Sequence, residues 1–166
     1  MRKIIYNKFD KHDITALPKV LFSGRIIVIN TAAEAEKAVD YLMSQKILGI
    51  DTETRPSFKK GQTHNVALLQ VSTHDTCFLF RLNLTGITPA IIRLLEDPSI
   101  PKIGLSLRDD INSLHKRADF HPGNFIDLQK HVCELGVEDL SLQKLYANFF
   151  HQKISKSVRL SNWESD

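Results

Sequence analysis

Two carboxylates stand two positions apart at the end of an apolar stretch in the first third of the chain. Residues 47–50 are mostly apolar and predict a buried strand, which Asp51 and Glu53 then follow. Side chains at positions i and i+2 of a strand share one face, so we expect Asp51 and Glu53 side by side and Thr52 on the other face. Like charges held together are costly unless a cation lies between them. Because carboxylate oxygens suit Mg²⁺ and Mn²⁺, the pair indicates a metal site; the alternative is two solvated acids at the start of a loop.

A third acid follows a later strand. Residues 102–106 predict a buried strand, and residues 107–118 predict the helix after it, with Asp109 and Asp110 in its first turn. An acid in that turn is expected to face the end of the sheet near Asp51 and Glu53. Three converging carboxylates can hold two divalent ions about 4 Å apart, which is the arrangement used to hydrolyse phosphodiesters.

The elements that would position these acids form one α/β domain with a mixed sheet. Strands are predicted at residues 25–30, 47–54, 66–72, 76–81 and 102–106, and the middle three, joined by short links, predict an antiparallel meander. Thr31 and Glu34 form a capping-box pattern for a helix that continues to Gln45. Further helices are predicted at residues 88–95 and from about 139, where Asp139 and Ser141 are both plausible caps. Residues 125–128 suit either a strand or a helix start, and residues 1–24 a lead-in arm.

Composition sets the broad class of the protein. The 166 residues are 42% hydrophobic and 25% charged, which is ordinary globular usage and enough for one core. The net charge of +3 favours anionic partners only mildly. Cys77 and Cys133 lie far apart and form no metal-spacing pair, so a reducing compartment is the default. With no apolar stretch of membrane-spanning length or signal-peptide pattern, we expect a cytoplasmic protein that does not bind membranes.

Several motifs, taken in order, resemble one family. They are Asp51-x-Glu53, the A-L-L-Q-V strand at residues 67–71, and Lys102-x-Gly104 leading to Asp110. The L-S-L segment at residues 140–142 and the R-L-S-N-W segment at 159–163 add to the pattern. From about residue 25 to residue 166 the chain resembles the 3′→5′ exonuclease domains of the DEDD superfamily, in particular the RNase D and Werner-syndrome exonuclease branch.

The resemblance implies a fold, a cofactor and a substrate. The fold would be RNase H-like, with a mixed five-stranded sheet flanked by helices. Two divalent cations, Mg²⁺ or Mn²⁺, would serve removal of nucleotides from the single-stranded 3′ end of DNA or RNA. By position, Asp51 would bind both ions, Glu53 the ion that activates water, and Asp110 the second ion. Asp109 is the alternative to Asp110 for this role, and the family's spacing from Gly104 favours Asp110.

Other residues are candidates for contact with the substrate. In this family Thr52 would offer backbone contacts to the terminal nucleotide, and Thr54 stands with it at the strand end. Gln70 could contact the substrate, although a role as a polar partner for a sheet edge is favoured. Lys59 suits a phosphate contact, and a solvated loop position is the alternative. Asp127 suits a helix N-cap better than a metal ligand.

One motif of the family has no counterpart in this sequence. It is a tyrosine followed four positions later by an aspartate, beyond the S-N-W segment, and the sequence ends at Asp166. We therefore expect an exonuclease domain truncated before its last motif. Two alternatives stay open: a catalytically impaired nucleic-acid-binding module, and a two-metal phosphoesterase with a non-nucleic substrate.

Overall fold

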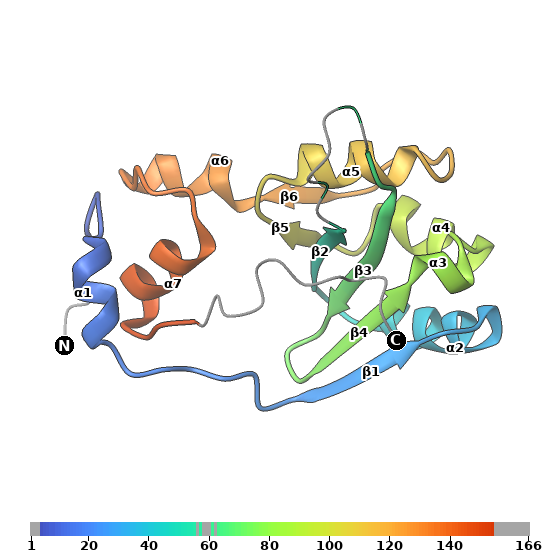
Figure 1. The fold of residues 1–166 in the computed structure, drawn as a ribbon, viewed down its shortest axis with the longest axis horizontal. Helices are drawn as coiled ribbons and strands as arrows, with labels where there is room; N and C mark the ends of the chain where they lie inside the picture. The colour runs from blue at the N-terminus through green and yellow to red at the C-terminus, as the bar shows by residue number, and fades with distance from the viewer. Residues whose placement is uncertain (1–3, 56, 58–60, 62, 155–166) are drawn as a thin grey trace.

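The protein is built on a single mixed sheet. The computed structural model describes residues 4–55, 57, 61 and 63–154. Within them six strands are arranged in the order β1–β4–β3–β2–β5–β6 (Figure 1). The strands are β1 (Arg25–Ile29), β2 (Leu48–Thr54), β3 (Val66–Ser72), β4 (Thr76–Arg81), β5 (Lys102–Gly104) and β6 (Phe125–Asp127). The α/β class and the mixed sheet are confirmed.

The predicted meander forms the middle of this sheet. Strands β2, β3 and β4 pair in antiparallel fashion, whereas β1 pairs with β4, β5 with β2, and β6 with β5 in parallel. The sheet has six strands rather than the five expected, because the segment that suited either a strand or a helix start does both. Its residues Phe125–Asp127 pair with β5, and a helix starts at the next residue.

Helices cover the sheet and surround its ends. They are α1 (Lys11–Ala16), α2 (Ala32–Met43), α3 (Leu82–Thr85), α4 (Pro89–Glu96), α5 (Leu107–His115), α6 (Leu128–Val132), the 3₁₀ turn η1 (Cys133–Leu135) and α7 (Leu142–Phe150). Thr31 and Glu34 form the predicted capping box of α2. Helices α2 and α5 end two and three residues earlier than expected. No helix among the described residues is both long enough and apolar enough to cross a membrane.

The main core lies between the sheet and helices α2 and α4. Fully buried side chains from α2, such as Val39 and Leu42, meet Leu94 and Leu95 of α4 over the strand residues, among them Phe80. These aliphatic and aromatic groups recur at helical spacing on α2 and α4, so each helix turns one apolar face to the sheet. Leu48 and Ile50 belong to the same core, so this packing fixes β2, the strand that carries the first two acids.

The N-terminal arm packs on α7, the last helix that the structure describes. Helix α1 lies beside α7 (Figure 1), and Phe9 and Ile14 contact Ala147 in a small separate core. The buried Asn148 side chain accepts from the Tyr6 N–H at 2.9 Å and donates to the Tyr6 carbonyl at 2.7 Å. An amide that makes both bonds to one residue acts like a strand partner, and so it fixes the arm on α7.

Candidate active site

The central strand β2 extends beyond its neighbour β5. It pairs with β3 over most of its length, but with β5 only at Leu48 and Gly49. Strand β5 ends at Gly104, where an added Cβ would lie 2.6 Å from the Ile50 carbonyl oxygen and would also meet the Leu107 side chain. Glycine therefore lets the chain turn closely against β2 and enter α5. One edge of β2, from about Ile50 onward, faces α5 instead of a strand.

Asp51 and Glu53 alternate along β2 with Thr52 between them. Asp51 lies opposite Gln70 of β3, and Glu53 lies opposite Leu68, with an irregularity in the pairing immediately after Glu53. The strand pattern thus places both acids on one face, as predicted from their spacing. Asp51 is exposed and Glu53 is half-buried.

Asp110 reaches this strand from α5. Its Oδ1 accepts from the Thr52 hydroxyl at 2.5 Å and from the Thr52 N–H at 3.1 Å. The same N–H donates to Asp51 Oδ1 at 2.9 Å. One donor shared by two carboxylates places them side by side. Because β5 has already ended, the Thr52 N–H on this edge has no strand carbonyl to bind, and the two side chains accept from it instead.

The Thr52 side chain has a role that strand alternation did not predict. We expected it to point away from the acids, with only its backbone near the site. It does lie on the other face of β2, yet that face is where α5 brings Asp110. Asp109, the rival acid, is exposed in the same helical turn, and the structure places Asp110 rather than Asp109 against β2.

Burial raises the pKa of all three acids, and the charges of neighbouring site acids raise those of Asp51 and Glu53 further. Although Asp51 is exposed as a residue, the protein atoms around its carboxylate displace part of its water and raise its pKa; the charge of Asp110 raises it further, and the Thr52 N–H opposes the shift. Burial, then Asp51, then Asp110 raise the pKa of Glu53. Burial raises the pKa of Asp110 against the two Thr52 hydrogen bonds. Partly desolvated carboxylates that repel one another favour a bound cation.

The donor chemistry fits a hard divalent cation, although the side chains are not arranged around one. Three carboxylates supply oxygens of the kind that Mg²⁺ and Mn²⁺ prefer. Across residues 4–154, apart from the undescribed loop positions, no three His, Cys, Asp or Glu side chains are placed to hold an ion together. Asp110 is instead oriented by the Thr52 hydroxyl.

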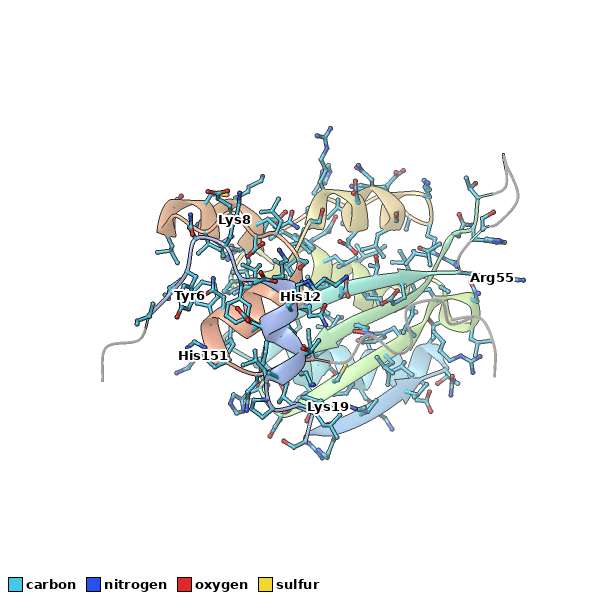
Figure 2. The ribbon with its side chains drawn as sticks, turned by 60° about the vertical axis from the view of Figure 1, so that its left-hand side comes forward. Tyr6, Lys8, His12, Lys19, Arg55 and His151 are labelled. Atoms are coloured by element: carbon cyan, nitrogen blue, oxygen red, sulfur yellow. The ribbon has the colours of Figure 1, made fainter. Side chains whose placement is uncertain are left out.

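The other predicted substrate residues are distributed around this centre. Gln70 is half-buried and paired with Asp51 across the strands. Thr54 is exposed at the end of β2. Beyond it Arg55 lies at the far end of the strand, away from Tyr6 and His12 on the arm (Figure 2). Lys59 lies outside the described residues.

Asp127 caps α6, as its sequence position predicts, and it also positions the start of α5. As favoured, it caps α6, with Oδ1 accepting from the Gln129 N–H at 3.0 Å. It also accepts from the N–H groups of Ser106 and Leu107, each at 3.1 Å, where α5 begins. Ser106 takes a positive φ of 59° in that turn. One carboxylate therefore fixes the start of the helix that carries Asp110. Local capping patterns do not predict this contact, because its partners are 20 and 21 positions apart in the sequence.

A groove opens beside Asp51. Its volume is about 800 Å³, and it extends along β2 and β5 to the segment that leads into α7. Asp51 and Gln70 contribute its polar wall, while Ile103, Leu105 and Leu142 belong to its apolar walls. A groove with an apolar side and a carboxylate end can receive both a base or sugar and a phosphate that a cation neutralises.

This architecture places the protein among the RNase H-like α/β domains, whose solved members share its fold. The structure of Escherichia coli RNase D superposes with a TM-score of 0.74 at 16% identity, covering 86% of this chain and 37% of that one. Trypanosoma brucei RNase D in complex with RNA U12 gives 0.73 at 19% identity, with 87% and 55% covered. The EXD2 exonuclease domain soaked in Mg and GMP gives 0.57 at 23% identity, with 86% and 77% covered.

Sequence similarity defines the family more narrowly. The family model described as 3′-5′ exonuclease matches residues 26–166, and the chain belongs to this family. The Mus musculus bifunctional 3′-5′ exonuclease/ATP-dependent helicase WRN is 28% identical over 162 residues, 90% of this chain and 11% of that protein. An Arabidopsis thaliana 3′-5′ exonuclease is 30% identical over 163 residues, 89% of this chain and 57% of that protein. The chain thus spans a small part of the mouse relative and just over half of the plant one.

Proposed function

We propose that this domain removes nucleotides from the single-stranded 3′ end of DNA or RNA, with Asp51, Glu53 and Asp110 as the ligands of two divalent cations. The observation that carries the proposal is the meeting of Asp51 and Asp110 at the Thr52 N–H on the free edge of β2, with Glu53 two positions along the same strand, in a chain of the 3′-5′ exonuclease family. Solved relatives of the same fold that hold RNA, or that were soaked in Mg and GMP, support the choice of ligand and metal.

Each residue has a distinct task in this proposal. The cations, when bound, would supply an activated water and neutralise the leaving oxygen of the phosphodiester. Asp51 would be a ligand of both cations, Glu53 of the one on the water side and Asp110 of the one on the leaving-group side. Thr52 keeps Asp51 and Asp110 together through its N–H, and Gln70 lies where it can orient the terminal nucleotide beside Asp51. The groove beside Asp51 would receive that nucleotide.

The test is a time course on 5′-labelled single-stranded DNA and RNA with Mn²⁺ or with EDTA. We expect a ladder that shortens from the 3′ end in Mn²⁺ only, and no ladder from a strand whose 3′ hydroxyl is blocked. Binding without any shortening would support the alternative of a nucleic-acid-binding module.

Neighbouring acids on α5 provide a matched pair of variants. Asp110→Asn should lower the rate by at least about 100-fold, since a metal ligand is lost, whereas Asp109→Asn should stay close to wild type. The reverse result, with Asp109 essential and Asp110 dispensable, would show that the acid has been assigned wrongly. Thermal shifts with Mn²⁺ measure the ligand role separately from turnover, because a ligand that binds only the folded state raises the melting temperature.

A further inference from the structure

A second cavity lies on the other side of α5 from Asp110. Its volume is about 370 Å³, and residues of α5, β6 and α6 line it at the edge of the sheet, where Figure 1 shows the three elements together. Arg108 and Asp110 are two positions apart on α5, about 200° around the helix axis. Since Asp110 faces β2, Arg108 faces the opposite way, and Asn112, one turn further on, lines the same cavity.

The rim of this cavity is cationic. Arg108 from α5 and Lys130 from α6 are exposed, and neither is in an ion pair within the part of the chain that the structure describes. His131 adds an imidazole, with its Nδ1 3.9 Å from a Glu134 oxygen. The one acid in the lining is Asp127, whose oxygens accept three backbone N–H groups at the starts of α5 and α6. Its charge is directed at the positive ends of two helices rather than at Arg108 and Lys130.

The floor of the cavity is apolar. Ile111, Phe125 and Ile126 are half-buried there beneath the charged rim. A planar guanidinium can bind two phosphate oxygens at once, an ammonium adds a point charge, and the Asn112 amide is a further donor. An apolar surface under such donors suits the sugar and base that accompany a backbone phosphate.

We infer that this cavity is a second contact site for the polynucleotide, in which Arg108 and Lys130 bind a backbone phosphate outside the catalytic groove. The inference rests on the proposed function only in taking a polynucleotide as the ligand. The site lies about one helix diameter, ~10 Å, from the Asp110 side of α5. A strand with its 3′ end at the carboxylates must therefore extend about three nucleotides to reach it, so the contact strengthens binding of strands longer than that and leaves the bond cleavage itself unchanged.

Salt dependence gives the most direct test. Binding of a labelled single strand of about 16 nucleotides is measured by fluorescence anisotropy in EDTA over a range of salt concentrations, using the full chain. Each phosphate contact on a single strand contributes about 0.7 to the slope of log K against log salt concentration. Because the two cations neutralise one phosphate, the double variant Arg108→Gln/Lys130→Gln should lose about 0.7 from that slope and bind about fivefold more weakly at low salt.

The matched control removes two positive charges elsewhere. Lys37→Gln/Lys116→Gln changes two exposed lysines on α2 and at the end of α5, neither of which lines the cavity. The control should keep nearly the wild-type slope, because net charge alone acts only through the long-range field. Equal slopes for the two double variants would overturn the inference, and so would saturation of the cavity by inorganic phosphate in an NMR titration without any change in strand binding.

Kinetics separate this inference from the proposed function. For a strand of about 16 nucleotides, Arg108→Gln/Lys130→Gln should raise KM with kcat unchanged, and for one of about two nucleotides, too short to span ~10 Å, neither constant should move. If the wild-type chain binds but does not cleave, the proposed function fails, while the salt slopes still decide whether Arg108 and Lys130 bind the strand. A fall in kcat on the short strand would contradict a contact site separate from the chemistry.

Discussion

The hydrogen bond from the Thr52 hydroxyl to Asp110 offers the sharpest test of how the acids are held. Thr52→Val removes the hydroxyl while keeping the shape of the side chain, and the Thr52 N–H still donates to Asp110 at 3.1 Å. The carboxylate is therefore not left without a donor. Hydrogen bonds to charged groups contribute about 1.5–3 kcal/mol, and the half-buried setting favours the lower end.

We expect Thr52→Val to lower the free energy of unfolding by about 1.5 kcal/mol in EDTA near neutral pH. For a chain of this size that corresponds to a fall of about 3–6 °C in the melting temperature. Urea and thermal denaturation followed by circular dichroism measure it. Thr52→Ser keeps the hydroxyl and should lie closer to wild type, and Thr54→Val, at an exposed site on the same strand, should change stability by no more than about 0.5 kcal/mol. If Thr52→Val unfolds together with the Thr54 control, the hydroxyl does not stabilise Asp110.

Two further predictions concern the supports of the site, and a third concerns the contact between the N-terminal arm and α7. Gly104→Ala should cost about 1–3 kcal/mol in urea denaturation, because its Cβ would collide with the backbone of β2; no loss would mean that β5 can move away. Asp127→Ala should cost about 2 kcal/mol, since three N–H groups lose their acceptor, and should slow turnover more than it weakens Mn²⁺ binding; the opposite order would make it a metal ligand. Burial raises the pKa of Asp139, but hydrogen bonds from Lys144 and Phe9 outweigh it and hold the pKa below its usual range. Its contribution is therefore present above about pH 4 and is lost as the pH falls further, so Asp139→Asn should flatten the acid limb of the stability curve, and an unchanged limb would count against it.

The parts of the fold that followed from the sequence are those with a local cause. Helix α2 carries a complete capping box at Thr31 and Glu34, and its apolar side chains recur at helical spacing. Strand β2 and the two strands after it show apolar stretches, and the link between β3 and β4 is only residues 73–75, so that antiparallel hairpin was predictable. The same-face arrangement of Asp51 and Glu53 needs only the period of a strand. The role of these acids as metal ligands stays a prediction.

What the sequence could not show depends on partners far along the chain. Helix α1 has six residues and no strong pattern of its own; its Ile14 packs on Ala147, and Asn148 binds Tyr6 just before it, both more than 130 positions away. A short helix of this kind is stabilised by tertiary packing rather than by propensity. Asp127 likewise looked like the cap of one helix, and its hold on α5 depends on the parallel pairing that brings β6 next to β5.

The difference in length between β2 and β5 explains why Asp51 and Asp110 lie together. Strand β2 continues past the end of β5, so backbone N–H groups on that edge need another acceptor. Here the acceptors are carboxylates. The shared N–H of Thr52 offsets part of the repulsion between Asp51 and Asp110, which lets two acids lie together in a partly buried place. The same donors would compete with a cation for these oxygens. Asp110 should therefore have to give up the Thr52 hydroxyl to bind metal fully, and Thr52→Val, although less stable in EDTA, should then regain stability on addition of Mn²⁺ at least as strongly as the wild-type chain.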